Sequence, residues 1–200
     1  SDDGQASKAS TMKSRTAVLA LGLTQIIGYG TLYYSFSVLA PAMAREFGLS
    51  TEWVFGALSV SLLVGGLSAP WVGGWIDRRG AGRVMTIGSL AAALALAVCA
   101  MAGNSAMLVL GLIAIQIAST LVQYSASFTL LVQLNPATAQ RSITYLTLMA
   151  GFASTLFWPF TTALHARLDW HHVYLLFALM HLFVCLPVHG WLMVKTRTIS

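Results

Sequence analysis

Six long apolar runs, separated by short polar breaks, dominate the sequence. The runs are continuous and do not alternate with polar residues, so they do not fit half-buried strands. Their lengths of 18 to 28 residues are close to or above the roughly 20 residues with which a helix crosses a bilayer, and in lipid a helix satisfies its own backbone polar groups. We therefore predict six membrane-spanning helices, at residues 17–40, 53–76, 84–101, 107–134, 143–165 and 173–194.

Lysine and arginine residues are unevenly divided between the two sides of the expected bundle. The breaks are short, so neighbouring helices must run antiparallel. One side then carries Arg45 and Arg167 alone, and the other carries Lys8, Lys13, Arg15, Arg78, Arg79, Arg83, Arg141, Lys195 and Arg197. Because cytoplasmic loops are enriched in basic residues, we expect both termini in the cytoplasm and a multi-pass protein of the plasma (inner) membrane. The predicted parts are polar cytoplasmic tails at 1–16 and 195–200 and a six-helix transmembrane domain at 17–194.

The composition supports a membrane protein and excludes several other classes. Hydrophobic residues make up 57% of the chain and charged residues 8%, whereas an ordinary soluble domain has about 25% charged residues. These figures also exclude a disordered chain, and two cysteines exclude a disulfide scaffold. The net charge of +5 comes from basic residues dispersed between the apolar runs, so we predict no nucleic-acid partner. No soluble catalytic motif and no set of metal ligands is present, and we predict no enzyme, no metal and no cofactor.

The second break contains an unusual segment, residues 73–83, which reads GGWIDRRGAGR. Glycines let backbones approach closely, and a carboxylate at the membrane boundary can pair with arginines or cap a helix. For the arginines alone, an ordinary positively charged cytoplasmic turn explains the pattern equally well.

This segment resembles the signature G-x-x-x-D-R-x-G-x-x-R between the second and third helices of the major facilitator superfamily. The resemblance covers the six-span pattern across 17–194. It implies an all-α membrane protein with six transmembrane helices in a three-plus-three inverted repeat, which is half of a major-facilitator fold of twelve spans. In that family these positions form cytoplasmic contacts between the halves, so the resemblance implies a conformational gate at Gly73, Asp77, Arg78, Gly80 and Arg83.

Prolines recur at corresponding places in the two predicted repeats. Pro41 and Pro136 close the first and fourth runs, and Pro70 and Pro159 lie in the later halves of the second and fifth. This spacing is consistent with a three-plus-three arrangement. We expect Pro70 and Pro159 to bend their helices.

Two features bear on the branch of the family. The first run, with Gly28-Tyr29-Gly30 and the segment YYSFS at 33–37, is similar to the branch of oxalate/formate and monocarboxylate carriers. Ile113 stands three residues before a glutamine, where many members have arginine, and Trp158-Pro159 replaces the Gly-Pro of drug–proton antiporters. These departures speak against a drug–proton antiporter.

Uncharged polar residues form stripes on three of the predicted helices. Such groups need water or a hydrogen-bond partner inside the membrane. One interpretation is a central cavity that binds substrate, and the other is a set of hydrogen bonds between helices, each contributing about 0.6 kcal/mol. For a single Ser or Thr we favour the helix contact, and for the Gln and Tyr stripes we favour the cavity. The predicted substrate-binding residues are Gln25, Tyr29, Tyr33, Gln116, Thr120, Gln123 and Trp158.

Ionisable residues are almost absent from the middle of the runs. His181 is the one such residue near mid-membrane, in the sixth run, and is the candidate for proton coupling. A structural histidine with satisfied hydrogen bonds is the alternative interpretation, because the sixth helix is peripheral in the resembled fold.

The predicted function is that of a secondary active transporter, or its N-terminal half, which moves a small organic solute by alternating access. Its partners would be the lipid bilayer, a small-molecule substrate and a second six-helix half, supplied by a separate chain, a second copy or a missing C-terminal half. The alternative is a non-transporting membrane subunit that binds or regulates a partner.

Overall fold

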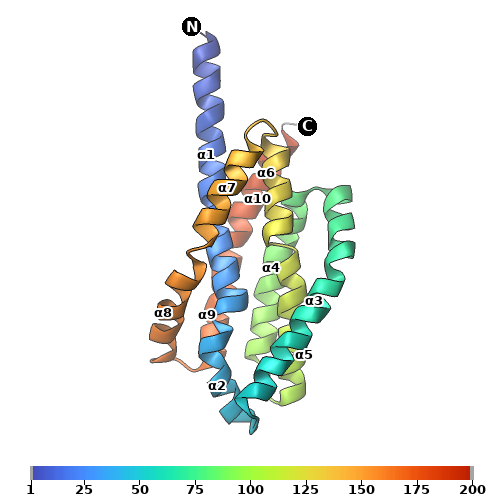
Figure 1. The fold of residues 1–200 in the computed structure, drawn as a ribbon, viewed down its shortest axis with the longest axis vertical. Coiled ribbons are helices and arrows are strands. Elements are labelled where there is room, and N and C mark those ends of the chain that lie inside the picture. The colour runs from blue at the N-terminus through green and yellow to red at the C-terminus, as the bar shows by residue number, and fades with distance from the viewer. Residues whose placement is uncertain (1, 199–200) are drawn as a thin grey trace.

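A computed structural model describes residues 2–198, with side chains at residues 4, 5 and 14–198. Within these residues helices are the only regular secondary structure, and six segments are long and apolar enough to cross a membrane, as the sequence predicts. These spans are Ser14–Phe47, Thr51–Arg79, Ala81–Ala100, Ser105–Leu134, Ala139–His165 and Trp170–Arg197. Their elements (Figure 1) are α1 (Asp2–Tyr29), η1 (Gly30–Tyr34), α2 (Phe36–Phe47), α3 (Thr51–Arg79), α4 (Ala81–Ala100), α5 (Ser105–Thr120), α6 (Tyr124–Leu134), α7 (Ala139–Ala150), α8 (Ala153–His165), α9 (Trp170–Met180), η2 (His181–Cys185) and α10 (Leu186–Arg197).

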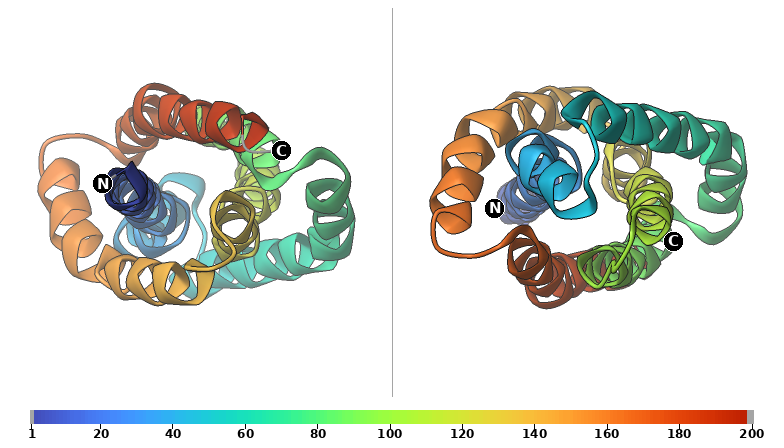
Figure 2. Two further views of the ribbon diagram at one scale, coloured as in Figure 1. Left: turned by 90° about the horizontal axis from the view of Figure 1, so that it is seen from above. Right: turned by 90° about the horizontal axis from the view of Figure 1, so that it is seen from below.

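The spans are packed as one bundle in which the third span has a central place. Helix α4 packs against α5 of the fourth span and against α9 and α10 of the sixth. Helix α3 packs mainly on α5, and α1 packs mainly on α7. Figure 2, which looks along the bundle, shows α8 and the later part of α3 at opposite edges. The second and fifth spans are therefore the outlying ones.

Helix starts at one end of the bundle are fixed by side-chain caps. Ser50, Asn104 and Asp169 precede α3, α5 and α9, and each side-chain oxygen accepts a hydrogen bond from the backbone N–H three residues later, at 3.1, 2.8 and 2.9 Å. Such caps satisfy N–H groups that a helix leaves unpaired in its first turn. The three even-numbered spans thus begin at the same end, as an antiparallel bundle requires.

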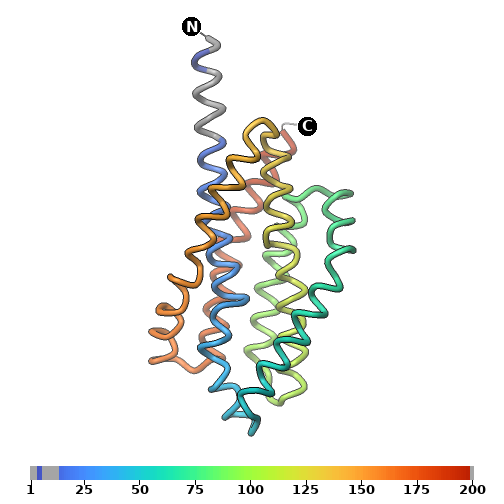
Figure 3. The backbone as a smooth tube through the Cα atoms, viewed as in Figure 1, coloured from blue at the N-terminus to red at the C-terminus, as the bar shows by residue number. Residues whose placement is uncertain are grey.

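Four spans are irregular, which the sequence pattern does not predict. The first and sixth contain the π-helical segments η1 and η2, and the fourth and fifth are interrupted after Thr120 and after Ala150. None of these irregularities falls on Pro70 or Pro159, which lie inside α3 and α8. The trace in Figure 3 shows the interruption between α7 and α8, and it also shows α3 changing direction in its second half, which contains Pro70.

Close helix packing depends on glycine at particular crossings. A Cβ atom added at Gly111 of α5 would lie 2.7 Å from Cβ and 2.8 Å from Cα of Cys99 in α4. One at Gly82 would lie 2.7 Å from Cα of Met193 in α10. These contacts bring α4 against both neighbours, and small residues at helix interfaces are what allow such approach in membranes.

Candidate functional site

A small pocket lies among the first, second and fourth spans. It has a volume of about 220 Å³ and is lined by Tyr29, Ala69, Val72, Thr120, Gln123, Tyr124 and Ser125. Three of the seven residues predicted to bind substrate, Tyr29, Thr120 and Gln123, are thus brought together. The interruption of the fourth span creates the site, because α5 ends at Thr120 and α6 begins only at Tyr124. Gln123 precedes that second helix and is therefore not held in a regular helical stripe.

Aromatic rings form one wall of this pocket. The rings of Tyr29 and Tyr124 have their centroids 4.8 Å apart, and Tyr124 stacks on Phe128 at 4.9 Å. Tyr124 follows Gln123 directly in sequence, which is the signal that could have added it to the predicted site. The lining offers hydroxyl, amide and ring contacts, and no lining residue is charged.

Gln25 and Gln116 lie outside the pocket, buried between the first and fourth spans. Gln25 Nε2 donates to the carbonyl of Val122 at 2.7 Å, and Gln116 Nε2 donates to the carbonyl of Leu32 at 3.0 Å. Val122 lies in the interruption of the fourth span and Leu32 lies in η1, so each glutamine binds an irregular turn of the other span. We call these two bonds the glutamine clasp. In this arrangement both side chains form hydrogen bonds between helices, which is the alternative to a substrate-binding cavity for the polar stripes.

The clasp has the same sequence spacing in both spans. Positions 25 and 116 stand equally far from the irregular segments of their own spans, which begin at 30 and 121. Because the two spans run in opposite directions, this equivalence is that of an inverted repeat.

Tyr33 and Trp158 are placed on an exposed face, away from the pocket lining. Tyr33 is 41% and Trp158 49% exposed. Trp158 Nε1 donates to the carbonyl of Tyr34 at 3.1 Å, and the Tyr34 ring lies edge-on to both Trp158 and Tyr33. These residues join α8 to η1, and neither Tyr33 nor Trp158 is among the residues that line the pocket.

The predicted gate residues gather where α3 meets α4. Asp77 and Arg78 are exposed on the last turn of α3, and Arg83 lies in the first turn of α4. Gly80 joins the helices with φ of +84°, a left-handed conformation that favours glycine. No salt bridge involves Asp77, Arg78 or Arg83 within the part of the chain that the structure describes. A Cβ at Gly73 would meet nothing within 4 Å, so packing inside this bundle does not explain that glycine.

The comparison with known families decides the identity. The profile described as Major Facilitator Superfamily matches residues 21–199, which is most of the chain. The chain belongs to the major facilitator superfamily. Members of this superfamily are transporters and not enzymes, so the match implies a transporter-type function in general terms. The comparison with curated proteins gives no match, and the oxalate/formate–monocarboxylate branch is not confirmed.

In this major facilitator chain, His181 is built into a polar seam and lies apart from the pocket. It is 1% exposed, and its Nε2 lies 2.7 Å from Oγ1 of Thr31. The Thr31 hydroxyl also donates to the carbonyl of Ile27, so the ring nitrogen is the donor in the contact with His181. His189 is equally buried and lies between Ser89 and Thr24 at 2.5 and 2.9 Å. The two histidines connect the sixth span to the first and third.

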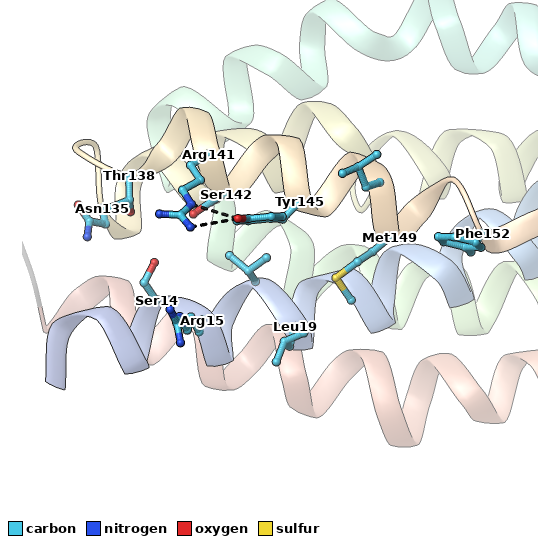
Figure 4. Close-up of a pocket in the computed structure, with 12 residues that line it drawn as sticks. Ser14, Arg15, Leu19, Asn135, Thr138, Arg141, Ser142, Tyr145, Met149 and Phe152 are labelled. Atoms are coloured by element: carbon cyan, nitrogen blue, oxygen red, sulfur yellow. Dashed lines mark hydrogen bonds between the residues drawn. The ribbon is translucent and has the colours of Figure 1, made fainter. Parts of the chain in front are cut away.

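A larger groove opens between α1 and α7 at the end of the bundle where both termini lie (Figure 4). It has a volume of about 590 Å³, and its lining includes Arg15, Arg141 and Tyr145. The sequence indicated the two arginines as markers of topology and did not show that they share a groove, because their positions lie on different spans and only the packing of α1 on α7 brings them together.

Proposed function

We propose that this chain forms one six-helix body of a secondary transporter that moves a small organic solute by alternating access. The pocket at Tyr29, Thr120 and Gln123 carries the proposal, because it places uncharged hydrogen-bonding groups and two aromatic rings beside the interruption of a membrane span. Irregular backbone at membrane depth is tolerated where it is buried in protein or lines a cavity, and transporters use such interrupted helices at their binding sites.

The chemistry of the lining favours a small solute held by hydrogen bonds and ring contacts. A volume of about 220 Å³ is below the usual 300–1,000 Å³ of a ligand pocket. The proposal is therefore that this pocket is one wall of a site that a second six-helix body completes, from a separate chain, a second copy or a C-terminal half.

The gate at Gly73, Asp77, Arg78, Gly80 and Arg83 belongs to the same proposal. Asp77 and Arg78 are exposed, Arg83 is half-buried, and none of the three forms a salt bridge within the described residues, so they are available to a second body. The orientation with both termini in the cytoplasm, inferred from the distribution of basic residues, places this gate on the cytoplasmic side. His181 remains the coupling candidate. Its Nδ1 is buried without a hydrogen-bond partner among the described residues, and such a site can take up a proton only with a compensating change around it.

Cysteine accessibility tests the pocket directly. Both native cysteines are buried, Cys99 at 0% and Cys185 at 1% exposure, so the unmodified chain supplies a low background. Tyr29→Cys and Gln123→Cys are labelled in proteoliposomes with a membrane-impermeant maleimide, and Gln116→Cys serves as the buried control in the same span. We expect the first two to react and the control to stay protected.

Protection of Tyr29→Cys and Gln123→Cys to the level of Gln116→Cys would overturn the hydrated pocket. That result would favour a membrane subunit whose polar stripes are dry helix contacts. For the gate, Asp77→Asn should shift the balance between inward- and outward-facing states, measured by labelling on each side. An unchanged balance in the assembled transporter would remove Asp77 from the gate.

A further inference from the structure

One histidine joins the first, third and sixth spans at the end of the bundle opposite the two termini (Figure 1). His171, in the first turn of α9, lies between the last turn of α2 and the last residue of α4. Its Nε2 lies 2.8 Å from each carboxylate oxygen of Glu46, and its Nδ1 contacts the carbonyl oxygen of Ala100. We call these contacts the histidine bridge. Both nitrogens of one ring thus face oxygen atoms that belong to other spans.

The partners of the ring determine which form of the histidine makes the bridge. A backbone carbonyl and an ionised carboxylate only accept hydrogen bonds, whereas a neutral imidazole has a single N–H to donate. The Glu46 carboxylate also accepts a hydrogen bond from Trp170 Nε1 at 2.7 Å, which favours its ionised form. Between these two acceptors a neutral ring would turn one lone pair towards an oxygen atom. Only the imidazolium, which donates from both nitrogens, completes the bridge.

The surroundings of the ring also suit a positive charge. Ala100 is the last residue of α4 and Glu46 lies in the last turn of α2, and the carbonyl end of a helix attracts cations. The indole of Trp170 stacks on the His171 ring with the centroids 3.8 Å apart, and an aromatic face attracts a cation at that distance. Two helix ends, a carboxylate and an aromatic ring therefore all favour the imidazolium.

The charged groups around the bridge add one more negative charge. Asp169, which caps α9, acts on the His171 ring as a second carboxylate, and its Oδ1 lies 2.7 Å from Nδ1 of His172. The other titratable side chains on α2, α4, α8 and α9 are Arg45, Arg83, Cys99, His165, His172 and Tyr174. Of the two arginines in this set, Arg83 lies at the far end of α4 and Arg45 is exposed beside Glu46.

We propose that His171 is a proton-binding site on the outer face, and that its protonated form holds the end of α2 against α4 and α9. The proposal goes beyond the transport function and uses only the orientation proposed above, which makes this end the outer one. The side chains of His171 and Glu46 are 24% and 43% exposed, so protons reach them from the outer water. The bridge is complete in acid and is lost as the pH rises and His171 gives up its proton.

The position of the bridge in the first span determines what its loss changes. Helix α2 lies beyond η1, and the glutamine clasp holds the first span at Gln25 and at Leu32. Loss of the bridge therefore loosens the outer end of the first span while the clasp stays intact. The pH of the outer solution would in this way set how firmly that end is held.

Histidine-selective 15N NMR of the chain in nanodiscs tests the protonation state, with the His171 signal assigned by its loss in His171→Gln. The pH is raised from about 5 to about 9, which covers the range in which histidine changes charge. His165 is the internal reference, because its Nδ1 lies 3.1 Å from the carbonyl of Leu168 and it forms no salt bridge within the described residues. We expect His171 to keep both ring protons at a pH at which His165 has lost one. Loss of a proton from His171 at the same or a lower pH would overturn the proposal.

Electron paramagnetic resonance tests the hold on α2. Spin labels at Arg45→Cys and Val98→Cys, both exposed positions, report the distance between the ends of α2 and α4, and the native cysteines are buried. We expect a narrow distance distribution at about pH 5 and loss of this narrow component at about pH 9. A distribution that does not change with pH would overturn the hold even if His171 is charged.

Three variants in the labelled background separate the bridge from general effects of pH. His171→Arg stays charged and carries several N–H donors, so it should give the narrow distribution at both pH values. His171→Gln should give the broad one at both. His172→Gln, the matched control one residue along the helix, should respond to pH as the wild-type chain does. A broad distribution for His171→Arg, or loss of the pH response in His172→Gln, would each contradict the proposal, and the first of these decides if His171→Gln folds poorly.

Discussion

The second and fifth spans differ from the others in how much of their surface the bundle covers. In the most apolar stretch of each, 22% is buried, compared with 61% for the first span and 56% for the third. All of these spans are apolar enough to cross a membrane, so composition does not distinguish them. The difference shows that the first, third, fourth and sixth spans make the packed core of the bundle, whereas the second and fifth spans leave broad faces to lipid or to another protein.

Two adjacent glycines of α3 show the difference between the packed core and the open face. In α3, Gly65 faces the core, where an added Cβ would lie 3.0 Å from the carbonyl oxygen of Gln116, whereas at the adjacent Gly66 it would meet nothing within 4 Å. One turn of a single helix therefore contains both environments. The contrast can be tested by changes that are chemically identical and differ only in location.

The largest effect is expected from adding one methyl group in the core. Gly111→Ala would force α5 away from α4 at Cys99, because the contact at 2.8 Å is with a Cα atom that cannot rotate away. We expect a loss of about 2 kcal/mol in the free energy of unfolding, measured by SDS titration in mixed micelles. The matched change Gly66→Ala on the open face should be neutral or stabilising by up to about 1 kcal/mol. Equal effects would contradict the division.

An intermediate effect is expected from the glutamine clasp. Gln116→Leu leaves the carbonyl of Leu32 without its donor and should cost about 1 kcal/mol in the same assay, within the range measured for hydrogen bonds between membrane helices. Gln25→Leu should cost less, because Gln25 Oε1 is buried without a partner among the described residues and leucine removes that unsatisfied group. Ser59→Ala, on the open face of α3, provides the baseline near zero. If Gln116→Leu changed the free energy of unfolding no more than Ser59→Ala does, the glutamine clasp would not stabilise the contact between the first and fourth spans.

The smallest effect is expected at the helix caps outside the membrane core, where it depends on pH. The backbone N–H of His172 donates to Asp169 and holds the pKa of that carboxyl below its usual value of 3.8. Because the folded-state pKa is lowered, the ionised cap stabilises the protein above that value and loses this contribution as the pH falls through the folded-state pKa. Asp169→Ala should therefore cost about 0.5 kcal/mol at neutral pH and less in acid.

Ser50→Ala is the matched control, since Ser50 caps α3 in the second span without an ionisable group. Its cost should be similar at neutral pH and independent of pH over the same range. A pH-independent cost for Asp169→Ala would refute the role assigned to its ionised form.

The sequence predicts the spans well and their irregularities poorly. The predicted run at 107–134 corresponds to the span Ser105–Leu134, because twenty or more apolar residues leave few alternatives in a membrane. The break inside that span has no proline or glycine to announce it. It is held by Gln25, from another span, so it depends on tertiary contacts that a local pattern does not contain.

The sequence likewise predicts part of the candidate site and misplaces the rest. Helical spacing was enough to select Tyr29, Thr120 and Gln123, which line one pocket. It also selected Gln25 and Gln116, which fit the same stripes but bond to backbone carbonyls. Periodicity identifies the face of a helix, and it does not show whether a neighbouring helix occupies that face.

The reciprocal bonding of the first and fourth spans limits how this protein can move. If one of these helices slid along the other, both glutamine hydrogen bonds, which lie at different depths in the bilayer, would break together. We therefore expect the two helices to move as one rigid unit. A movement that widens the pocket beside Tyr29 must then come from α3 tilting relative to this pair of helices, or from the whole bundle rotating against the surface on which it packs.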